Sequence, residues 1–271
     1  MPVILQNIEH PVKNGSSSAR SIKISIETLK INDGEFVGII DAGEGGAVIL
    51  GKIICGLVHP KLGNLSMSGI SVFLDCECEK AFSELSVEKE MCRHMNGTKL
   101  KKDEMLEEAK SALVFVGFDY DTIKNRSPFE LSAGDRRKIA IAAALALHPD
   151  VLVLNDPMRD MDELWCSRLM ELLKKINNRG TTVLLLTSDT SRLAEAADRI
   201  IILKNGSLVI DSSAKTVFSE YYALIHLGIP VPEVKKCCQM LRARGMDMPN
   251  NIILYDQFID RLKILLWRKN K

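Results

Sequence analysis

Apolar and polar residues alternate with a period of two near the start of the chain. The segment "SIKISIETLKI" (21–31) follows this pattern, which is typical of a strand with one buried face. The run "EFVGII" (35–40) is almost wholly apolar and predicts a buried strand. The segment "NGSSSAR" (14–20), just before the first of these strands, predicts a turn. The first 40 residues therefore predict strands joined by turns.

Helical and strand-like patterns then alternate along the chain. Buried strands are expected at 151–156 and 181–188, and "IIILKNGSLVIDS" (200–212) predicts a hairpin around Asn205 and Gly206. Strands that alternate with helices favour an α/β domain with a largely parallel sheet. Short helical patterns beyond Phe218 predict a small separate appendage. The expected helices lie at about 47–58, 84–118, 134–147, 163–180, 190–199, 233–244 and 256–266.

Composition narrows the class of protein. The 271 residues carry 36 basic and 35 acidic side chains, so the charge balance does not favour nucleic-acid binding. There is no apolar run of about 18 residues for a membrane span and no signal-peptide layout, which predicts a cytoplasmic chain. The odd count of seven cysteines favours reduced thiols. The spacing of Cys76 and Cys78 does not suit a zinc site, so no metal site is expected there.

The stretch "DAGEGGAVILGKIICGL" (41–57) contains an apparent phosphate-loop pattern. Gly46 and the pair Gly51-Lys52 have the spacing GxxxxGK, but Ile53 stands where Ser or Thr is needed. In this register "AVIL" would have to wrap around phosphate. Such a loop needs glycine and positive φ angles, which β-branched side chains resist. The match at Lys52 is therefore interpreted as a chance one.

Three longer segments resemble ABC-transporter ATPases. The segment "LSAGDRRKIAIAAALALHPDVLVLNDP" (131–157) resembles their signature helix and acidic strand, and residues 35–69 resemble their phosphate-loop segment. The hairpin "ADRIIILKNGSLVIDSS" (197–213) matches their last hairpin. Residues 81–91 and 227–249 are similar to the energy-coupling-factor (ECF) branch. The resemblance covers about residues 1–215, and several motifs in order are more specific than any one alone.

The resemblance implies a fold, partners and a cofactor. The fold class is α/β, a P-loop NTPase-like nucleotide-binding domain with a mixed sheet flanked by helices. It would occupy residues 1–217, with a helical subdomain at about 76–135, and a helical extension at 218–271 would serve dimerisation. In this family, ATP and Mg²⁺ lie between two ATPase subunits arranged head to tail. A transmembrane coupling subunit completes the assembly, which places the chain at the cytoplasmic face of the membrane.

The resemblance also sets the register of the phosphate loop, at Asp41 to Val48. Ala47 then stands at the position of the phosphate-binding Lys, and Val48 at that of the Mg²⁺-binding Ser or Thr. Asp41 and Glu44 add negative charge where phosphates would lie, and like charges repel. The loop glycines still permit the turn; they are Gly43, Gly45 and Gly46.

Further family positions differ at the same implied site. Asn155 stands where the family has the Mg²⁺-coordinating Asp, and Asp156 where it has the Glu that orients water. Ser188 replaces the switch His, and Leu74 replaces the Gln that senses metal and water. Phosphoryl transfer depends on positioned charge, so these changes predict no hydrolysis at this chain's own loop.

The signature is better preserved than the loop. Leu131, Ser132 and Gly134 match the family's LSGGQ, whereas Ala133 and Asp135 depart from it. The resemblance implies that residues 132–135 contact ATP on a partner's phosphate loop. The alternative is a packed helix with a Ser cap and no ligand. The basic residues that follow, Arg136, Arg137 and Lys138, are interpreted as a solvated helix face.

The function predicted from these residues is that of an ECF-type ATP-binding subunit with a degenerate site of its own. It would lend its signature to an active ATPase, which is either a related subunit or a second copy. One alternative is an active ATPase that uses atypical ligands such as Lys52 or Asp156. The other is a scaffold or regulator without a transport role.

Overall fold

One nine-stranded sheet organises the chain. The computed structural model describes residues 2–12, 22–43 and 45–269, so the turn predicted at 14–20 lies outside the described residues. The strand order across the sheet is β4-β1-β2-β9-β8-β3-β7-β6-β5. The strands are β1 (Val3–Val12), β2 (Ile22–Ile31), β3 (Phe36–Asp41), β4 (Leu62–Ser66), β5 (Ser71–Leu74), β6 (Val151–Asn155), β7 (Thr182–Leu186), β8 (Arg199–Lys204) and β9 (Ser207–Ser213).

Strand directions divide the sheet into two parts. The strands β8, β3, β7, β6 and β5 pair parallel to one another in this order. The pairs β4–β1, β1–β2 and β8–β9 are antiparallel, and β2 meets β9 in parallel. The sheet is therefore mixed, and the α/β fold class implied by the resemblance is confirmed. Because the central strands are parallel, their carboxyl ends lie at one edge of the sheet.

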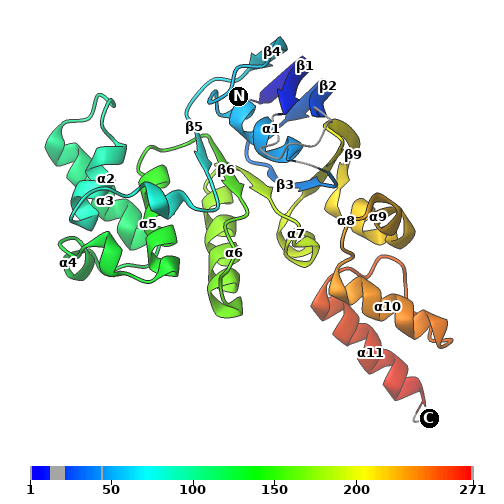
Figure 1. Cartoon of the computed structure of the whole chain (residues 1–271). Helices are drawn as coiled ribbons and strands as arrows, with labels where there is room; N and C mark the ends of the chain where they lie inside the picture. Colours follow the sequence, from blue (N-terminus) through cyan, green and yellow to red (C-terminus); the bar gives the residue numbers. More distant parts are fainter. Residues whose placement is uncertain (1, 13–21, 44, 270–271) are drawn as a thin grey trace.

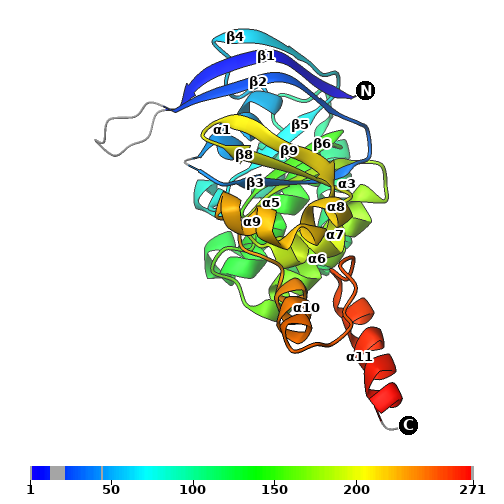
Figure 2. The ribbon, with the colours of Figure 1, turned by 90° about the vertical axis from the view of Figure 1, so that its right-hand side faces the viewer.

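Helices cover both faces of the central strands (Figures 1 and 2). The helices before the C-terminal region are α1 (Gly46–Ile54), α2 (Val87–His94), α3 (Lys102–Phe115), α4 (Tyr120–Ile123), α5 (Ala133–Leu145), α6 (Glu163–Asn177) and α7 (Thr190–Ala196). Figure 1 shows α2 to α5 gathered on one side of the molecule. These helices lie between β5 and β6 in the sequence, although the two strands are neighbours in the sheet.

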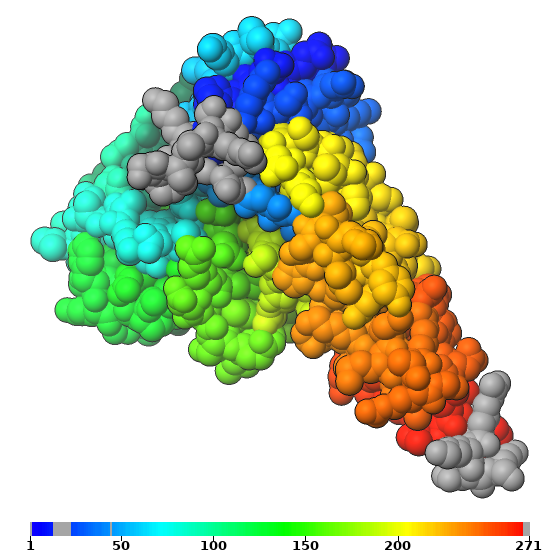
Figure 3. All heavy atoms as spheres, turned by 45° about the vertical axis from the view of Figure 1, so that its right-hand side comes forward, coloured from blue at the N-terminus to red at the C-terminus, as the bar shows by residue number. Residues whose placement is uncertain are grey.

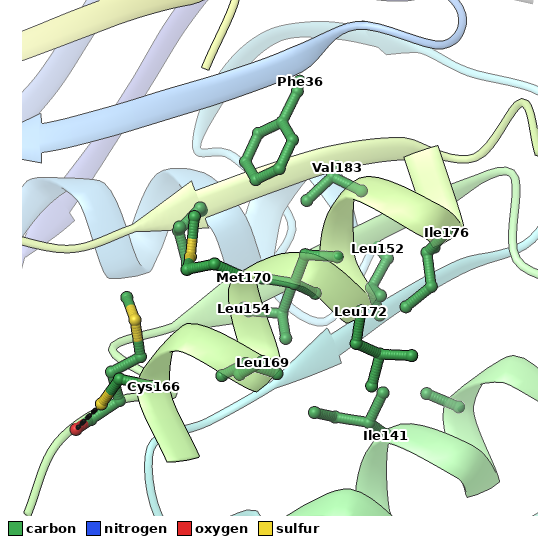
Figure 4. Close-up of a cluster of buried hydrophobic side chains, with 14 of the residues drawn as sticks. Phe36, Ile141, Leu152, Leu154, Cys166, Leu169, Met170, Leu172, Ile176 and Val183 are labelled. Atoms are coloured by element: carbon green, nitrogen blue, oxygen red, sulfur yellow. Dashed lines mark hydrogen bonds between the residues drawn. The ribbon is translucent and has the colours of Figure 1, made fainter. Parts of the chain in front are cut away.

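The alternation of side chains along β3 joins two hydrophobic cores. Val37 and Ile39 point to the core that contains α1, whereas Phe36 and Ile40 point to the core that contains α5 and α6. All four are buried. Figure 4 shows Phe36 in the second core, which includes Leu154 of β6 and Leu169 of α6. This two-sided burial explains why the run 35–40 is apolar throughout.

Helix α1 ends earlier than the predicted end at Val58. It stops at Ile54, and Gly56 takes a left-handed φ of 68°. The amide of Gly56 donates to the Ile53 carbonyl, and the amide of Leu57 donates to the Lys52 carbonyl. A glycine in this conformation closes the last turn and prevents further helix. The prediction of a helix to residue 58 is therefore wrong by about one turn.

The C-terminal region consists of helices. They are α8 (Ala214–Ser219), α9 (Tyr221–Leu227), α10 (Glu233–Ala243) and α11 (Tyr255–Lys269). Figure 3 shows that the last of them project from the body of the molecule. Cys238, Met248 and Ile252 form a small core between α10 and α11. No helix within the described residues is long and apolar enough to cross a bilayer.

Candidate functional site

Residues that the sequence analysis singled out lie at the carboxyl edge of the parallel strands. Asp41 ends β3, Leu74 ends β5 and Asn155 ends β6, while Ser188 follows the end of β7 by two residues. In the sheet, β3 is next to β7, β7 to β6, and β6 to β5. Neighbouring strands lie about 4.8 Å apart, so the fold brings these positions to one place.

The loop after β3 has the strand, turn and helix order that the sequence predicts. Gly45 takes a left-handed φ of 86° and helix α1 begins at Gly46. Residues 47–50 are helical, so "AVIL" does not form a loop. Lys52 lies in the last turn of α1, with its Nζ 5.7 Å from the centre of the Phe73 ring. Lys52 therefore stands at the far end of α1 from the loop, beside Phe73 of β5.

The Asp41 carboxylate binds the inside of the loop. Its Oδ1 accepts a hydrogen bond from the Gly43 amide at 2.9 Å, and its Oδ2 accepts one from the Ala47 amide, also at 2.9 Å. Ala47 is 4% exposed and brings neither charge nor donor side chain. Glu44 lies outside the described residues. From the sequence, Asp41 is expected to repel phosphate; the structure shows it as a hydrogen-bond acceptor for the loop.

The same loop packs closely against the turn between β8 and β9. The Ala42 amide donates to the Leu203 carbonyl at 2.8 Å. A Cβ on Gly43 would lie 3.1 Å from the Asn205 amide nitrogen, and one on Gly46 would lie 3.5 Å from the Gly206 Cα. Gly43 thus lets the loop backbone approach the hairpin turn, whereas a Cβ on Gly46 would make an ordinary contact. The loop is held from outside by the hairpin and from inside by Asp41.

The end of β6 is occupied by an amide–carboxylate pair. The Asn155 Nδ2 donates to the Asp75 Oδ1 at 2.7 Å. Burial acts to raise the pKa of Asp75, but hydrogen bonds from Asn155 and the Cys76 amide outweigh it, so this pKa is lowered. The sequence analysis did not single out Asp75. Its place directly after Leu74 at the edge of the sheet was the signal available.

Asp156 lies outside the strand and is bound by its neighbours. Its φ is 45°, in the left-handed region, so β6 ends at Asn155 rather than at the predicted residue 156. The Thr187 hydroxyl donates to the Asp156 Oδ1 at 3.1 Å, and the Arg159 Nε lies 3.4 Å from its Oδ2. Both carboxylate oxygens thus have a partner within the chain.

Ser188 is exposed and lines a polar hollow of about 460 Å³. The hollow is bounded by α6, α7 and the segment 230–236 at the start of α10. The Glu233 amide donates to the Ser191 Oγ at 3.2 Å, which joins the start of α10 to the first turn of α7. Ser188, which the resemblance places near the nucleotide, therefore lies in a hollow that the C-terminal region also lines.

The segment 131–135 begins helix α5 with a reciprocal cap. The Ser132 Oγ accepts from the Asp135 amide at 3.1 Å and donates to the Asp135 Oδ2 at 2.9 Å. The Lys138 Nζ lies 3.4 Å from the other carboxylate oxygen. Ser132 and Ala133 are exposed. The Ser cap of the packed-helix alternative is present. Ser132 is also exposed, and its contact with a ligand stays a prediction.

Gly134 is buried against helix α6. A Cβ at this position would lie 2.5 Å from the Trp165 Nε1 and 2.6 Å from its Cδ1. Real Cβ atoms do not approach other atoms so closely, so only glycine fits without a shift. The glycine serves the packing of α5 on Trp165 whatever its role toward a ligand.

Arg137 is buried, and its interpretation as part of a solvated face is wrong. Its side chain is 5% exposed and lies 3.0 Å from the Glu79 carboxylate. It also donates to the carbonyls of Pro157 and Arg159 at 2.9 Å and of Cys76 at 2.6 Å. Arg137 thus ties the signature helix to the segments after β5 and β6, which sequence periodicity alone does not place beside it.

Comparison with known proteins agrees with this arrangement. The model of the ABC transporter family matches residues 25–159, which include the loop after β3, the signature segment and the end of β6. The chain belongs to the ABC-transporter ATP-binding family. Members of the family bind ATP with Mg²⁺.

The relatives extend the match beyond the family model. The energy-coupling factor transporter ATP-binding protein EcfA2 of Clostridium perfringens is 25% identical over 286 residues, covering 100% of both chains. A putative ABC transporter ATP-binding protein of Methanosarcina acetivorans is 28% identical, over 97% of this chain and 93% of that protein. The ECF resemblance is confirmed by relatives that span nearly the whole chain.

A solved structure supports the fold. The chain is similar to cbiO1 from Clostridium perfringens, part of the ABC transporter complex cbiONQ, with a TM-score of 0.65 and 21% identity. The similarity covers 83% of this chain and 93% of that one. At this identity the likeness shows the fold alone.

Two groups that hold ATP with Mg²⁺ in phosphate loops are missing from the side chains at this ABC site. A family member needs an ammonium and a hydroxyl at the start of the helix after the loop. Here Ala47 and Val48 supply neither, and the Ala47 amide is bound by Asp41. The amide of Asn155 is bound to Asp75 in place of a metal-binding carboxylate.

Proposed function

We propose that this chain is an ATP-binding-cassette subunit of an ECF-type uptake transporter that does not hydrolyse ATP at its own loop. The observation that carries the proposal is the start of α1. Its Ala47 amide is bound by the Asp41 carboxylate, and no ammonium or hydroxyl side chain stands at Ala47 or Val48. Catalysis of phosphoryl transfer needs positioned positive charge, and this loop places negative charge there.

The signature segment would serve the loop of a partner ATPase. Ser132 is exposed at the N-terminus of α5, a 13-residue helix whose dipole favours an anion. A composite site would then hold ATP and Mg²⁺ on the partner's loop, with Ser132 to Asp135 of this chain closing it. The partner must carry an intact loop, which favours a different subunit over a second copy.

The other regions of the chain would mediate assembly with partner subunits. Residues 1–217 would form the nucleotide-binding domain with its helical subdomain at about 76–135, and residues 218–271 would serve dimerisation. A transmembrane coupling subunit would hold the pair at the cytoplasmic face of the membrane. The support is that relatives named as ECF ATP-binding proteins match both the domain and the extension.

The test uses the full-length chain, alone and with an ATPase subunit that has an intact phosphate loop. A fluorescent ATP analogue with Mg²⁺ is titrated into the lone chain, and we expect no saturable binding at micromolar nucleotide. In the complex, Asp156→Ala should leave the ATPase rate unchanged. Micromolar, Mg²⁺-dependent binding by the lone chain would contradict the proposal, as would loss of activity in Asp156→Ala.

A further inference from the structure

We propose that the Asp41 carboxylate is a permanent internal substitute for bound phosphate in the loop after β3. It keeps the loop in its phosphate-binding shape and excludes external phosphate groups. The inference rests on the proposed function, because it gives a physical cause for the loss of hydrolysis at this loop. It also makes Asp41 a specificity-determining residue rather than a neutral relic of sequence drift.

The contacts of Asp41 are those of an anion held by loop amides. Each carboxylate oxygen accepts one backbone N–H, from Gly43 on one side and from Ala47 in the first turn of α1 on the other. Oxygens of phosphate are held in loops of this kind by the same type of donor. Hydrogen bonds from amides to a charged acceptor are stronger than those between neutral groups.

The glycines lie close to this carboxylate, but it does not require them. A Cβ on Gly43 would lie 3.5 Å from the Asp41 Oδ1, and one on Gly46 would lie 3.7 Å from its Oδ2, which are ordinary van der Waals distances. The tighter contact of Gly43 is with the hairpin, because the same Cβ would lie 3.1 Å from the Asn205 amide nitrogen. Gly45 takes a left-handed φ of 86° directly before α1, a conformation that favours glycine.

An external phosphate would have to displace this carboxylate. The two anions compete for the amides of Gly43 and Ala47, and they repel each other at contact distance. Asp41 is tethered at the end of β3, so its effective concentration at these amides exceeds that of any dissolved anion. Asp41 therefore keeps the amides of Gly43 and Ala47.

The first experiment measures the loop directly. Hydrogen exchange of the Gly43 and Ala47 amides is followed by NMR in the full chain and in Asp41→Asn, which keeps the size and removes the charge. We expect exchange at these amides to be roughly ten-fold faster or more in the variant, because a charge-assisted bond is lost. The control is Glu27→Gln, which removes an exposed carboxylate from β2 in the same part of the molecule. Equal exchange in Asp41→Asn and Glu27→Gln would overturn the inference.

The second experiment tests exclusion. Inorganic pyrophosphate is titrated by calorimetry into Ala47→Lys, which supplies the missing ammonium, and into the double variant Asp41→Gly/Ala47→Lys. We expect the double variant to bind at least about ten-fold more tightly, because the competing carboxylate is gone. Equal affinity, or no binding by either variant, would overturn the inference.

The two proposals can fail separately. ATP binding by the unaltered chain would remove the proposed function. If the unaltered chain binds no ATP but the Asp41 variants change neither amide exchange nor pyrophosphate affinity, the proposed function stands and the role of Asp41 is wrong.

Discussion

The phosphate loop and the signature segment of this chain both place a carboxylate at the start of a helix, but they do so differently. In the loop, Asp41 reaches back from the end of a strand and binds two amides, one of them belonging to the buried Ala47. In the signature, Asp135 lies within the first turn of α5 and pairs with the exposed Ser132 hydroxyl. The first helix start is bound by a side chain from the preceding strand, and the second is capped by a residue pair within its own first turn, with Ser132 exposed.

The difference teaches how one protein can keep a fold while its two ligand-facing segments diverge. The loop is bound to the β8–β9 hairpin through the Ala42 amide, which donates to the Leu203 carbonyl. The signature segment is held from behind, by Arg137 and by the contact of Gly134 with Trp165. These contacts that hold the signature segment do not include the loop after β3. Substitutions in that loop therefore need not disturb the signature segment.

The largest expected effect comes from removing Arg137, the residue that holds the signature helix in place. Arg137→Ala leaves the Glu79 carboxylate and three carbonyls without their donor in a buried region. We expect the free energy of unfolding to fall by about 3–5 kcal/mol. Urea unfolding at pH 7 measures the change.

Arg136→Ala is the matched control for this prediction. Arg136 is less buried, and its Nη1 makes one hydrogen bond, to the Leu131 carbonyl at 2.8 Å. Its removal should cost about 1 kcal/mol. Equal losses in the two variants would mean that Arg137 does not tie the helix to the segments after β5 and β6.

The next largest effect concerns the packing of the signature glycine. Gly134→Ala should lower the free energy of unfolding by about 1–3 kcal/mol, because the added Cβ meets the Trp165 ring. In a Trp165→Ala background the same change should cost far less. Unfolding curves of the four proteins give the coupling energy. Additive costs would show that the glycine is not required by Trp165.

The third prediction restores the family's Asp at residue 155. In the unaltered chain the pKa of Asp75 is lowered: burial raises it, but the hydrogen bonds from Asn155 and the Cys76 amide outweigh burial. Asp75 therefore contributes stability above its unfolded pKa of about 3.9, and this stability is lost as pH falls through the lower folded pKa. Asn155→Asp reverses the sign, since it places a second carboxylate at the 2.7 Å contact with Asp75.

Asn155→Asp should be destabilised by about 1–2 kcal/mol at pH 7 and should recover part of this loss as pH falls from 6 to 4. Urea unfolding at several pH values measures the difference from the unaltered chain. Asn155→Ser is the control, because it removes the amide without adding charge and should show no recovery in acid. A pH-independent cost in Asn155→Asp would rule out repulsion with Asp75.

Much of the fold could be predicted because its signals are local. The apolar run of β3, the glycine turn, and the Asn205-Gly206 pair of the hairpin each determine their own backbone. Asn205 and Gly206 both take positive φ, at 51° and 79°, as a two-residue hairpin turn requires. The end of α1 was misjudged by one turn because the residues after Ile54 stay apolar, and only Gly56 marks the stop.

The interactions at the site could not be predicted from the same signals, because they join distant segments. Arg137 stands beside other basic residues in the sequence, and its acceptors come from residues 76–79 and 157–159. Asp41 is visibly an acid in a glycine-rich loop, but the sequence does not tell whether its carboxylate repels a ligand or replaces one. The direction of the Asp41 side chain decides this, and the structure shows it directed at the amides of Gly43 and Ala47.

The smallest effect on stability separates the two roles of the exposed Ser132. Glycine is tolerated as a helix cap, so Ser132→Gly should lower the free energy of unfolding by only a few tenths of a kcal/mol, whereas Ser132→Ala should cost about 1 kcal/mol. If Ser132 serves only as a cap, the complex with an active partner should keep its ATPase rate in Ser132→Gly and lose at most a little of it in the less stable Ser132→Ala. If its hydroxyl contacts the partner's ATP, the rate should fall about 100-fold in both variants, because a lost donor to a transition-state oxyanion costs this much. If the Ser132→Gly complex is well folded and fully active, Ser132 serves only as a helix cap. The start of α5 would then contact no ligand, just as the loop at Asp41 is proposed to contact none.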